Sequence, residues 1–476
     1  MVNILWGTGL SGKINFSFWK SVNKKPDYFC CNDETLWGTK FFSEVSVISP
    51  NKLAEIAKNE EVTVYVTSYA IFDISKQLIV LGVKKENIVW VQYPYLNEYE
   101  SFYDELKTKA HDYESIANFD RELGYYFELT YGTVLGGAQA WLYDEQKLLV
   151  KYGIKSINIL PSDVPCNEID LWGNCVKLER SPSKSLYLET LRYLLKGKLS
   201  SFISMTVCES FVAACSAKQI LGSKFQNIAV VHADYLPFYE CYSNNISNID
   251  YIYVISNKIE KELLARNVPA SKIKRLNWKV NFNFIERTYS LCNELKIVYF
   301  GRINLFPKRC DKLFDLVKKL VIAKIPFKLH IAGSGDYEST LRQNLVDNAL
   351  IDYVSFDGVI SKSDVEKYLS DKDIFVSVSD FEGHSISQYE SIAAGCVPVI
   401  FDVSGADDDV TDGYNGFLIK DNSIDSMVNR ISYLSLNREN LALFGKRGRE
   451  MVKRRNSVED PFITLYKELK FPTLKV

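Results

Sequence analysis

The sequence predicts an α/β protein made of three Rossmann-like domains, of which the first is the smallest. Its 476 residues are about three domains' worth of chain at roughly 150 residues per domain. Three apolar strands run directly into glycine-rich turns, at residues 3–6, 125–130 and 295–300. Each is followed by helical patterns that alternate with short β-branched runs, which is typical of parallel sheets with crossover helices.

Further strands are predicted within all three domains. They lie at 27–31, 62–68 and 87–91 in the accessory domain (residues 1–100), at 156–160, 202–205, 227–232 and 251–255 in the second domain (residues 124–288), and at 328–332, 354–356, 374–378 and 397–401 in the third (residues 289–476). Residues 101–123 are acidic and aromatic with a helical pattern, so we expect a helical linker there. A last helix is predicted at about 458–469, beyond the final strand.

Composition excludes several classes of protein. The 57 Lys and Arg residues nearly balance the 59 Asp and Glu residues, so a dedicated nucleic-acid-binding protein is not expected. The sequence contains no stretch of about 18 apolar residues, which is the length that a membrane-spanning helix needs. We expect no secretory signal at the N-terminus. The ten cysteines form no C-x-x-C and the four histidines lie far apart, so no metal site is predicted. Unpaired thiols suit a cytoplasmic protein.

The densest group of chemically useful residues lies between 380 and 399. A predicted strand leads into a loop with Glu382, and the helix that follows is stopped by Gly395. Amides at such a helix N-terminus, at the carboxyl end of a parallel strand, bind phosphates in doubly wound folds. Glu382 and Glu390 can face one crevice, where carboxylates accept hydrogen bonds from the paired hydroxyls of a sugar or ribose. Alternatively, Ser387-x-x-Glu390 is a capping box and Glu382 is a solvated loop charge.

Three other predicted strands end in residues that could bind the same ligand. Arg302 follows Gly301 at the end of one strand and Lys308 lies shortly after, and two fixed cations there suit a diphosphate. Gly333 and Gly358 end two further strands. Each glycine alone is an ordinary turn former. Because the carboxyl ends of parallel strands share one edge of a sheet, we expect the whole set to form one site.

With these motifs, residues of about 125–470 resemble the GT-B glycosyltransferases of family 4, which transfer sugars from nucleotide donors with retention of anomeric configuration. Glu382-x7-Glu390 looks like the family's E-x7-E segment, and residues 412–418 look like its D-G-x-N-G-x-L stretch. Gly136-Gly137 resembles the loop that approaches the donor phosphates. The resemblance implies a GT-B fold, in which the second predicted domain binds the acceptor and the third binds the nucleotide sugar across a cleft. Here the accessory domain precedes that pair.

The resemblance also implies roles for the site residues. Arg302 and Lys308 would stabilise the departing diphosphate, and Glu382 would contact hydroxyls of the transferred sugar near His232, which looks like the family's active-site histidine. The other donor-binding residues would be Glu390 at the ribose hydroxyls, Gly383, His384 and Ser385 through their amides, Gly136 and Gly137 near the phosphates, Gly358 and Val359 beside the base, and Gly333 at the same edge. The family needs no metal, and the acidic run at 407–409 is not interpreted as a metal-binding D-x-D.

The sequence therefore predicts a metal-independent retaining glycosyltransferase that acts in bacterial surface polysaccharide or glycoconjugate synthesis. Its donor would be a UDP- or GDP-sugar, and its acceptor a glycan, a lipid-linked glycan or a protein. Neither a cofactor nor nucleic acid is expected, and a homo-oligomer is left open. The basic, leucine-rich stretch at 184–198 is either an amphipathic helix on the inner face of an anionic membrane or an ordinary core-facing helix.

The accessory domain carries a second glycine motif. Gly7-x-Gly9-x-x-Gly12 follows a strand, and Asp33 lies about 20 residues further on, as in a dinucleotide-binding site. One alternative function is therefore a nucleotide-dependent oxidoreductase or epimerase centred on these glycines. Another is a protein that binds a sugar nucleotide without catalysis. For the domain itself we favour a structural, docking or oligomerising role.

Overall fold

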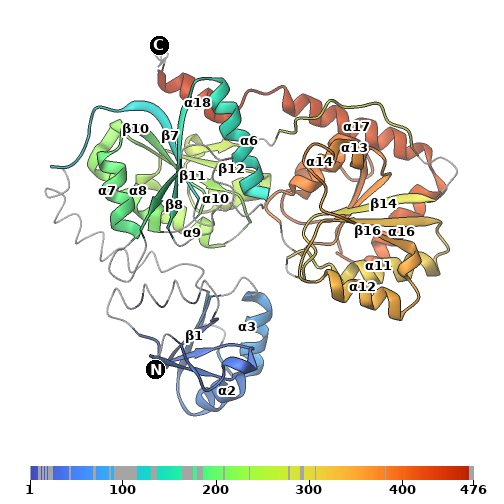
Figure 1. The fold of residues 1–476 in the computed structure, drawn as a ribbon, viewed down its shortest axis with the longest axis horizontal. Helices are drawn as coiled ribbons and strands as arrows, with labels where there is room; N and C mark the ends of the chain where they lie inside the picture. Colours follow the sequence, from blue (N-terminus) through green and yellow to red (C-terminus); the bar gives the residue numbers. More distant parts are fainter. Residues whose placement is uncertain are drawn as a thin grey trace.

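Three sheets, each with its own helices, make up the protein (Figure 1). The computed structural model describes residues 2–8, 12, 16, 19, 25–41, 44–67, 71–84, 87–90, 115–129, 137–162, 175–179, 186–206, 209–234, 236–276, 279–289, 294–305, 307–380 and 382–470. The predicted α/β class is confirmed by these parallel-rich sheets. The predicted domain boundaries stay predictions, and most of the predicted linker at 101–123 lies outside the described residues.

The first sheet has six strands in the order β3-β4-β2-β1-β5-β6. Its elements are β1 (Val2–Trp6), β2 (Tyr28–Cys30), β3 (Lys40–Phe41), β4 (Val45–Ile48), α2 (Pro50–Asn59), β5 (Val62–Val66), α3 (Ile71–Val80) and β6 (Ile88–Trp90). Leu5 and its neighbours Ile4 and Trp6 are all buried, because both faces of a doubly wound sheet are covered. Strands β3 and β4, which pair antiparallel, were not predicted from the sequence.

The second sheet has seven parallel strands in the order β13-β12-β11-β10-β7-β8-β9. Its strands are β7 (Glu122–Glu128), β8 (Lys155–Pro161), β9 (Cys175–Leu178), β10 (Leu199–Ser204), β11 (Gln226–Val231), β12 (Tyr251–Val254) and β13 (Ile273–Arg275). Its helices are α6 (Gly137–Lys151), α7 (Leu186–Lys196), α8 (Glu209–Leu221), α9 (Leu236–Asn244) and α10 (Asn257–Ala265). Four of the five leucines of α7 are buried and Leu188 is half-buried, so the core-facing interpretation of the basic, leucine-rich stretch is confirmed for this helix.

The third sheet has six parallel strands in the order β16-β15-β14-β17-β18-β19. Its strands are β14 (Leu295–Phe300), β15 (Phe327–Ala332), β16 (Val354–Gly358), β17 (Ile374–Ser377), β18 (Val397–Phe401) and β19 (Phe417–Ile419). Its helices are α11 (Asp311–Ile322), α12 (Glu338–Asp347), α13 (Val365–Ser370), α14 (Ile386–Ala394), α15 (Ala406–Asp409), α16 (Ile424–Leu436) and α17 (Glu439–Asn456). None of the described helices has the length and apolar character that crossing a membrane would need.

The strand order of the second and third sheets reverses once in each. The reversal falls between β7 and β10 in the second sheet and between β14 and β17 in the third. Open α/β sheets bind their ligands outside the carboxyl ends of the strands at such a switch point, because the two flanking loops diverge there and leave a crevice. The topology therefore places one ligand-binding edge on each of these two sheets.

The last helix, α18 (Pro461–Lys470), leaves the third sheet and packs on the second (Figure 1). Its Phe462 is fully buried, with the ring 4.8 Å from that of Tyr253 and 5.9 Å from that of Tyr125, measured between centroids. The Tyr125 hydroxyl donates to the Phe462 carbonyl oxygen at 2.7 Å. Asp460 caps the helix by accepting from the Phe462 amide at 2.9 Å. The helix that the sequence predicted near 458–469 thus joins the second and third sheets.

Shortening Phe462 to alanine should loosen this joint. Phe462→Ala removes a fully buried ring, and such a change costs about 3–5 kcal/mol of stability. Urea denaturation followed by tyrosine and tryptophan fluorescence measures the loss. Leu436→Ala, at a side chain that is 84% exposed, is the control and should change stability by about 0.5 kcal/mol or less. Equal effects of the two substitutions would contradict the packing described here.

Candidate functional site

The loops at the switch point of the third sheet pack backbone against backbone. The Gly301 amide donates to the Ala332 carbonyl at 3.0 Å, and the Gly333 amide donates to the Gly358 carbonyl at 2.7 Å. Gly333 has a φ of 134°, and a Cβ atom there would lie 1.9 Å from the Gly301 carbonyl oxygen. A side chain cannot fit. The predicted residues Gly301, Gly333 and Gly358 therefore meet at one edge of the sheet.

Lys308 and Glu382 form an ion pair beside this edge. The Lys308 Nζ lies 2.5 Å from Glu382 Oε1, and the Ser379 hydroxyl donates to the same oxygen at 2.8 Å. Both charged side chains are largely buried, at 15% and 13% exposure. The resemblance assigns these residues to different parts of a donor, whereas the structure brings them into direct contact. The lysine thus balances the carboxylate in a partly desolvated place, where an unpaired charge is costly.

Arg302 offers a cation that no described residue neutralises. Its carbonyl oxygen accepts from the Tyr299 hydroxyl at 2.6 Å, which fixes the backbone of the turn. Its exposed guanidinium makes no hydrogen bond or ion pair with the described residues. Arginine presents several N–H donors in a rigid fork that matches phosphate geometry. Arg302 is therefore placed to bind an anion at the carboxyl end of β14.

Helix α14 is capped by Ser385 at its N-terminus and by Gly395 at its C-terminus. Its N-cap is Ser385, whose hydroxyl accepts from the Gln388 amide at 3.3 Å. The capping box suggested for Ser387 and Glu390 is therefore wrong, because Ser387 lies within the first turn. Gly395 ends the helix with a φ of 91°, as predicted. The first amides of α14 are left to face the same edge as Arg302.

Glu390 is a carboxyl group on α14 that lies close to the contact between Lys362 and Asp144. It is half-buried on α14 and makes no hydrogen bond or ion pair with the described residues. Burial raises its pKa to about 7, although the positive charge of Lys362 works against that rise. Near neutral pH this carboxyl is therefore partly protonated in the ligand-free protein. Ligand hydroxyls that donate to it would favour the ionised form.

A buried aspartate that the sequence analysis missed holds the loop after Glu382 in place. Asp409 Oδ1 lies 3.1 Å from His384 Nε2 and also accepts from the Arg455 guanidinium. Asp409 Oδ2 accepts from the side-chain amide nitrogen of Gln388, Nε2, at 2.9 Å. Burial works to raise the pKa of Asp409, but His384 and Arg455 hold it below its usual value. The His384 side chain is almost fully buried, so only its backbone is left for a donor. The triple aspartate at 407–409 was the available signal, since acids rarely cluster inside a fold without partners.

The acidic run does not form a metal site within the described residues. No group of three or more metal-ligating side chains occurs in that part of the chain. Asp408 instead accepts from Arg275 Nη2 at 2.9 Å and from the Asn257 amide at 3.0 Å, both in the second sheet's domain. Asp408 thus connects the third sheet's domain to the second sheet's domain, and Asp409 holds the loop that follows Glu382.

His232 faces the loop from the second domain. It follows β11, and a Cβ atom placed on Gly383 would lie 2.0 Å from the His232 carbonyl oxygen. The carboxyl edges of the two sheets therefore touch at Gly383. The buried Nδ1 of His232 has no hydrogen-bond partner among the described residues. Burial lowers the pKa of this imidazole to about 4, so it is neutral at pH 7.

A second contact between the two domains lies near Glu390. Lys362, which follows β16, lies with its Nζ 2.5 Å from Asp144 Oδ2 on α6. Gly137 opens α6 at the switch point of the second sheet, whereas Gly136 and Gly9 lie outside the described residues. Val359 is 74% exposed beside Gly358, where a flat ligand could rest against it.

Local packing accounts for the described part of the glycine motif in the first domain. A Cβ atom on Gly7, which has a φ of 126°, would lie 2.4 Å from the Thr67 hydroxyl, and one on Gly12 would lie 2.0 Å from the Gly7 carbonyl oxygen. Asp33 Oδ1 accepts from the Thr35 amide and hydroxyl, at 3.0 and 2.6 Å, and so caps the short helix η1 (Glu34–Leu36). These three residues therefore have structural roles that need no dinucleotide.

Comparison with known proteins agrees with this geometry. Residues 285–451 match the family described as glycosyl transferases group 1. Over 153 residues the chain is 30% identical to the poly(ribitol-phosphate) alpha-N-acetylglucosaminyltransferase of Staphylococcus aureus, a match that covers 32% of this chain and 31% of that protein. The chain thus matches about a third of that relative's length.

Two solved structures show the fold. The lipopolysaccharide outer core galactosyltransferase WaaB superimposes with a TM-score of 0.59 at 18% identity, covering 74% of this chain and 100% of that one. HepE of Anabaena, solved with UDP and glucose, gives a TM-score of 0.58 at 14% identity, covering 75% and 100%. The predicted GT-B arrangement is therefore confirmed as the fold of the larger part of the chain.

The environment of His232 predicts how it titrates. NMR of the ring C–H groups should give one histidine with a pKa of about 4, and its signal should disappear in His232→Gln. Since the folded pKa lies below the unfolded value of about 6.5, the stability linked to this group is fully present above pH 6.5 and is lost as the pH falls toward 4. An assigned pKa of 6 or more would contradict the burial of Nδ1.

Proposed function

Residues 285–451 belong to the group 1 glycosyl transferases, and on this premise we propose that the chain transfers a sugar from a nucleotide-diphosphate sugar to a glycan acceptor with retention of anomeric configuration. One observation carries the proposal. Arg302 and Glu390, which have no partner among the described residues, converge with the Lys308–Glu382 pair at one switch point, opposite a neutral histidine on the facing domain. A nucleotide sugar presents the complementary groups, which are a diphosphate and two sets of hydroxyls.

The diphosphate would be bound by positive charge and by backbone amides. The Arg302 guanidinium has no partner among the described residues, and the N-terminus of the nine-residue helix α14 supplies N–H donors with a partial positive charge. Lys308 lies between β14 and α11, as Arg302 does, and would add a second positive charge while it is paired with Glu382. In a site that excludes water, fixed charges of this kind stabilise a developing anion strongly. We therefore assign Arg302 and Lys308 to the departing diphosphate.

The hydroxyl groups of the donor would meet the two carboxylates. Glu390 makes no hydrogen bond or ion pair within the described part of the chain, so it suits the ribose hydroxyls. Glu382 keeps Oε2 for a hydroxyl of the transferred sugar, because Lys308 and Ser379 both contact Oε1. His232 is neutral at pH 7, so its imidazole would contact the same sugar without adding charge.

The transfer itself needs little further protein chemistry. The bond between the anomeric carbon and the diphosphate oxygen breaks, and the acceptor hydroxyl attacks from the same face. The departing phosphate oxygen takes the acceptor's proton, so that no protein nucleophile is required. The protein would position the two substrates and stabilise the charge on the diphosphate.

The names of two similar proteins support a proposal for the substrate class. The Staphylococcus aureus relative is named for a poly(ribitol-phosphate) acceptor, and the HepE structure holds UDP and glucose. We propose a UDP- or GDP-sugar as the donor and a bacterial surface glycan or its lipid-linked precursor as the acceptor. The enzyme would then work in the cytoplasm, at the inner face of the membrane.

A donor panel tests the proposal. The purified protein is incubated with UDP-, GDP- and ADP-sugars in the presence of a chelator, and release of the nucleoside diphosphate is measured with and without glycan acceptors. We expect release from one class of donor, and NMR of the product should show that the anomeric configuration is retained. Turnover of none of these donors, or inversion of the configuration, would refute the proposed reaction.

Removing either cation should slow the reaction more than it weakens donor binding. Arg302→Ala and Lys308→Ala should each lower kcat by about 10²–10³, which is typical of losing one group that stabilises a developing oxyanion. Lys318→Ala, at an exposed lysine on α11, is the matched control and should leave kcat unchanged. If the two variants changed only KM, the cations would bind ground state and transition state equally.

The raised pKa of Glu390 predicts a pH dependence of donor binding. The ionised carboxylate accepts from hydroxyls, so the donor should bind about tenfold more weakly at pH 6 than at pH 8. Isothermal titration calorimetry with the nucleotide sugar measures this dependence. Glu390→Gln should bind more weakly and should lose the dependence over this range. The stability of the ligand-free protein should depend on pH in the opposite direction. Because the pKa of Glu390 is higher in the folded state, its contribution to folding stability is fully present below the unfolded pKa of about 4.5 and is lost as the pH rises through 7.

A further inference from the structure

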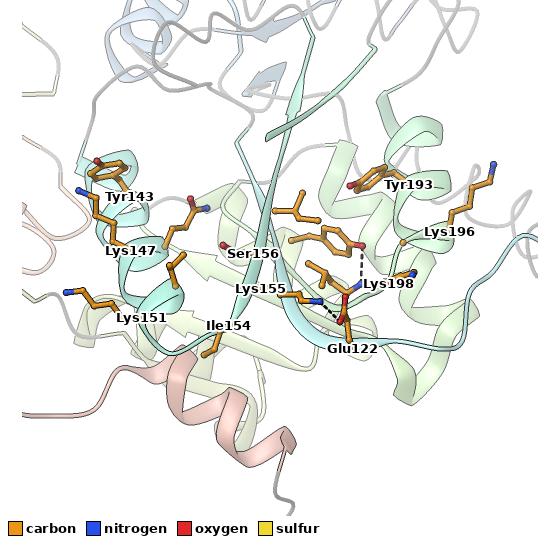
Figure 2. A pocket seen from close by; sticks show the side chains of 16 residues that line it. Glu122, Tyr143, Lys147, Lys151, Ile154, Lys155, Ser156, Tyr193, Lys196 and Lys198 are labelled. Carbon is orange, nitrogen blue, oxygen red and sulfur yellow. Dashed lines mark hydrogen bonds and ion pairs between the residues drawn. The ribbon is translucent and has the colours of Figure 1, made fainter. Parts of the chain in front are cut away.

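A pocket of about 1030 Å³, shown in Figure 2, lies at the amino ends of strands of the second sheet, opposite the carboxyl edge that meets the third domain. It includes Glu122, Lys155 and Leu199, which are the first residues of β7, β8 and β10. The remaining wall residues come mainly from α6 and α7. We call this feature the lysine pocket, after its lysines 147, 151, 155, 196 and 198.

The lysine pocket has a strong excess of positive charge. Five lysines line it together with a single carboxylate, Glu122, which pairs with Lys155 at 2.7 Å. Lys147 lies with its Nζ 4.1 Å from the centre of the Tyr143 ring. The ammonium groups of the other three lysines have no ion pair or hydrogen bond to the described residues. Like charges gathered in this way repel one another, and a bound anion would relieve that repulsion.

The five lysines are spread along the pocket rather than gathered at one point. Lys147 and Lys151 lie one helical turn apart on α6, so their backbones are separated by about 6 Å along the axis. Figure 2 shows these two on one side, Lys196 on the other, and Lys155 beside Glu122 between them. Tyr143 and Tyr193 add ring surfaces to the two sides. This distribution suits an elongated ligand with several negative charges better than a single small anion.

The distance to the cleft shows that the ligand cannot be the reacting group. Strand β7 runs through seven residues from the lysine pocket to the carboxyl edge, which is about 20 Å at the usual rise per residue. Helix α6 begins at the switch point of the second sheet and ends in the pocket. A long chain that lies along α6 would therefore reach both places.

We propose that the lysine pocket binds the phosphate groups of an extended anionic polymer, which is the distal part of the acceptor chain. This inference rests on the proposed function, because it takes the polymer to be the acceptor. Lysine binds phosphate as a compact point charge. Lys147 and Lys151 extend outward on one side of the pocket and Lys196 on the other (Figure 2), so the positive charge lies along the rim, where an extended chain can contact it. The acceptor is thus assigned to the class of phosphate-bearing glycans or polyol phosphates.

Binding is tested with short linear inorganic polyphosphate as the probe. Calorimetry compares the wild-type chain, the triple variant Lys151→Glu/Lys196→Glu/Lys198→Glu, and a control triple variant, Lys318→Glu/Lys420→Glu/Lys446→Glu, with the same change of charge on the third domain. We expect the first variant to bind at least about tenfold more weakly and the control to bind like the wild type, with affinity falling as salt rises. Equal loss in both variants would show a general charge effect and overturn the proposal.

Two further measurements separate the possible causes. Nucleoside diphosphate release from the donor alone should be the same in the wild type and the Lys151→Glu/Lys196→Glu/Lys198→Glu variant, which shows that the variant is folded and its cleft intact. If the wild type binds polyphosphate through these lysines but turns over no donor, the proposed function fails while the polyanion site stands. If phosphatidylglycerol vesicles, and not polyphosphate, bind in a manner that depends on these lysines, the pocket is a membrane contact and the polymer proposal is overturned.

Discussion

The contact between Gly383 and the carbonyl of His232 is the constraint on which the cleft depends. A methyl group on Gly383 would lie 2.0 Å from that carbonyl oxygen, so the two carboxyl edges can meet only because no side chain stands between them. Everything proposed for the reaction follows from this approach. It brings the end of β11 against the loop that lies between Glu382 and the first residues of α14.

Electrostatic balance is the second principle of the site. The chain carries almost no net charge, and the charges at the cleft are also mostly paired. Glu382 is neutralised by Lys308, Asp409 by His384 and Arg455, and Asp408 by Arg275. The unpaired groups are therefore informative. Arg302 and Glu390 are left without described partners at the places where a diphosphate and a pair of hydroxyls would sit.

The two ends of the second sheet differ in how their charges are paired. At its carboxyl end the sheet faces the third domain, and contacts such as Lys362 with Asp144 join the two. At its amino end five lysines stand around one carboxylate. A protein that only positioned a small acceptor would have no need of that second concentration of charge. The lysine pocket makes sense if the acceptor is long and anionic, because a weak contact repeated along a polymer raises the local concentration of its end at the cleft.

The sequence by itself determined the α/β class, most strands of the three sheets, the turn glycines and the set of groups at the carboxyl edge of the third sheet. Hydrophobic periodicity and glycine turns are local properties, so they can be read from neighbouring residues. Only the tertiary structure decided that Lys308 pairs with Glu382, 74 residues away, that Asp409 holds His384, and that α18 returns to Tyr125 across 337 residues. It also decided that lysines from α6, α7 and the strand ends share one pocket. These pairings depend on which faces of distant elements meet, and that is settled by packing of the whole chain rather than by any local pattern.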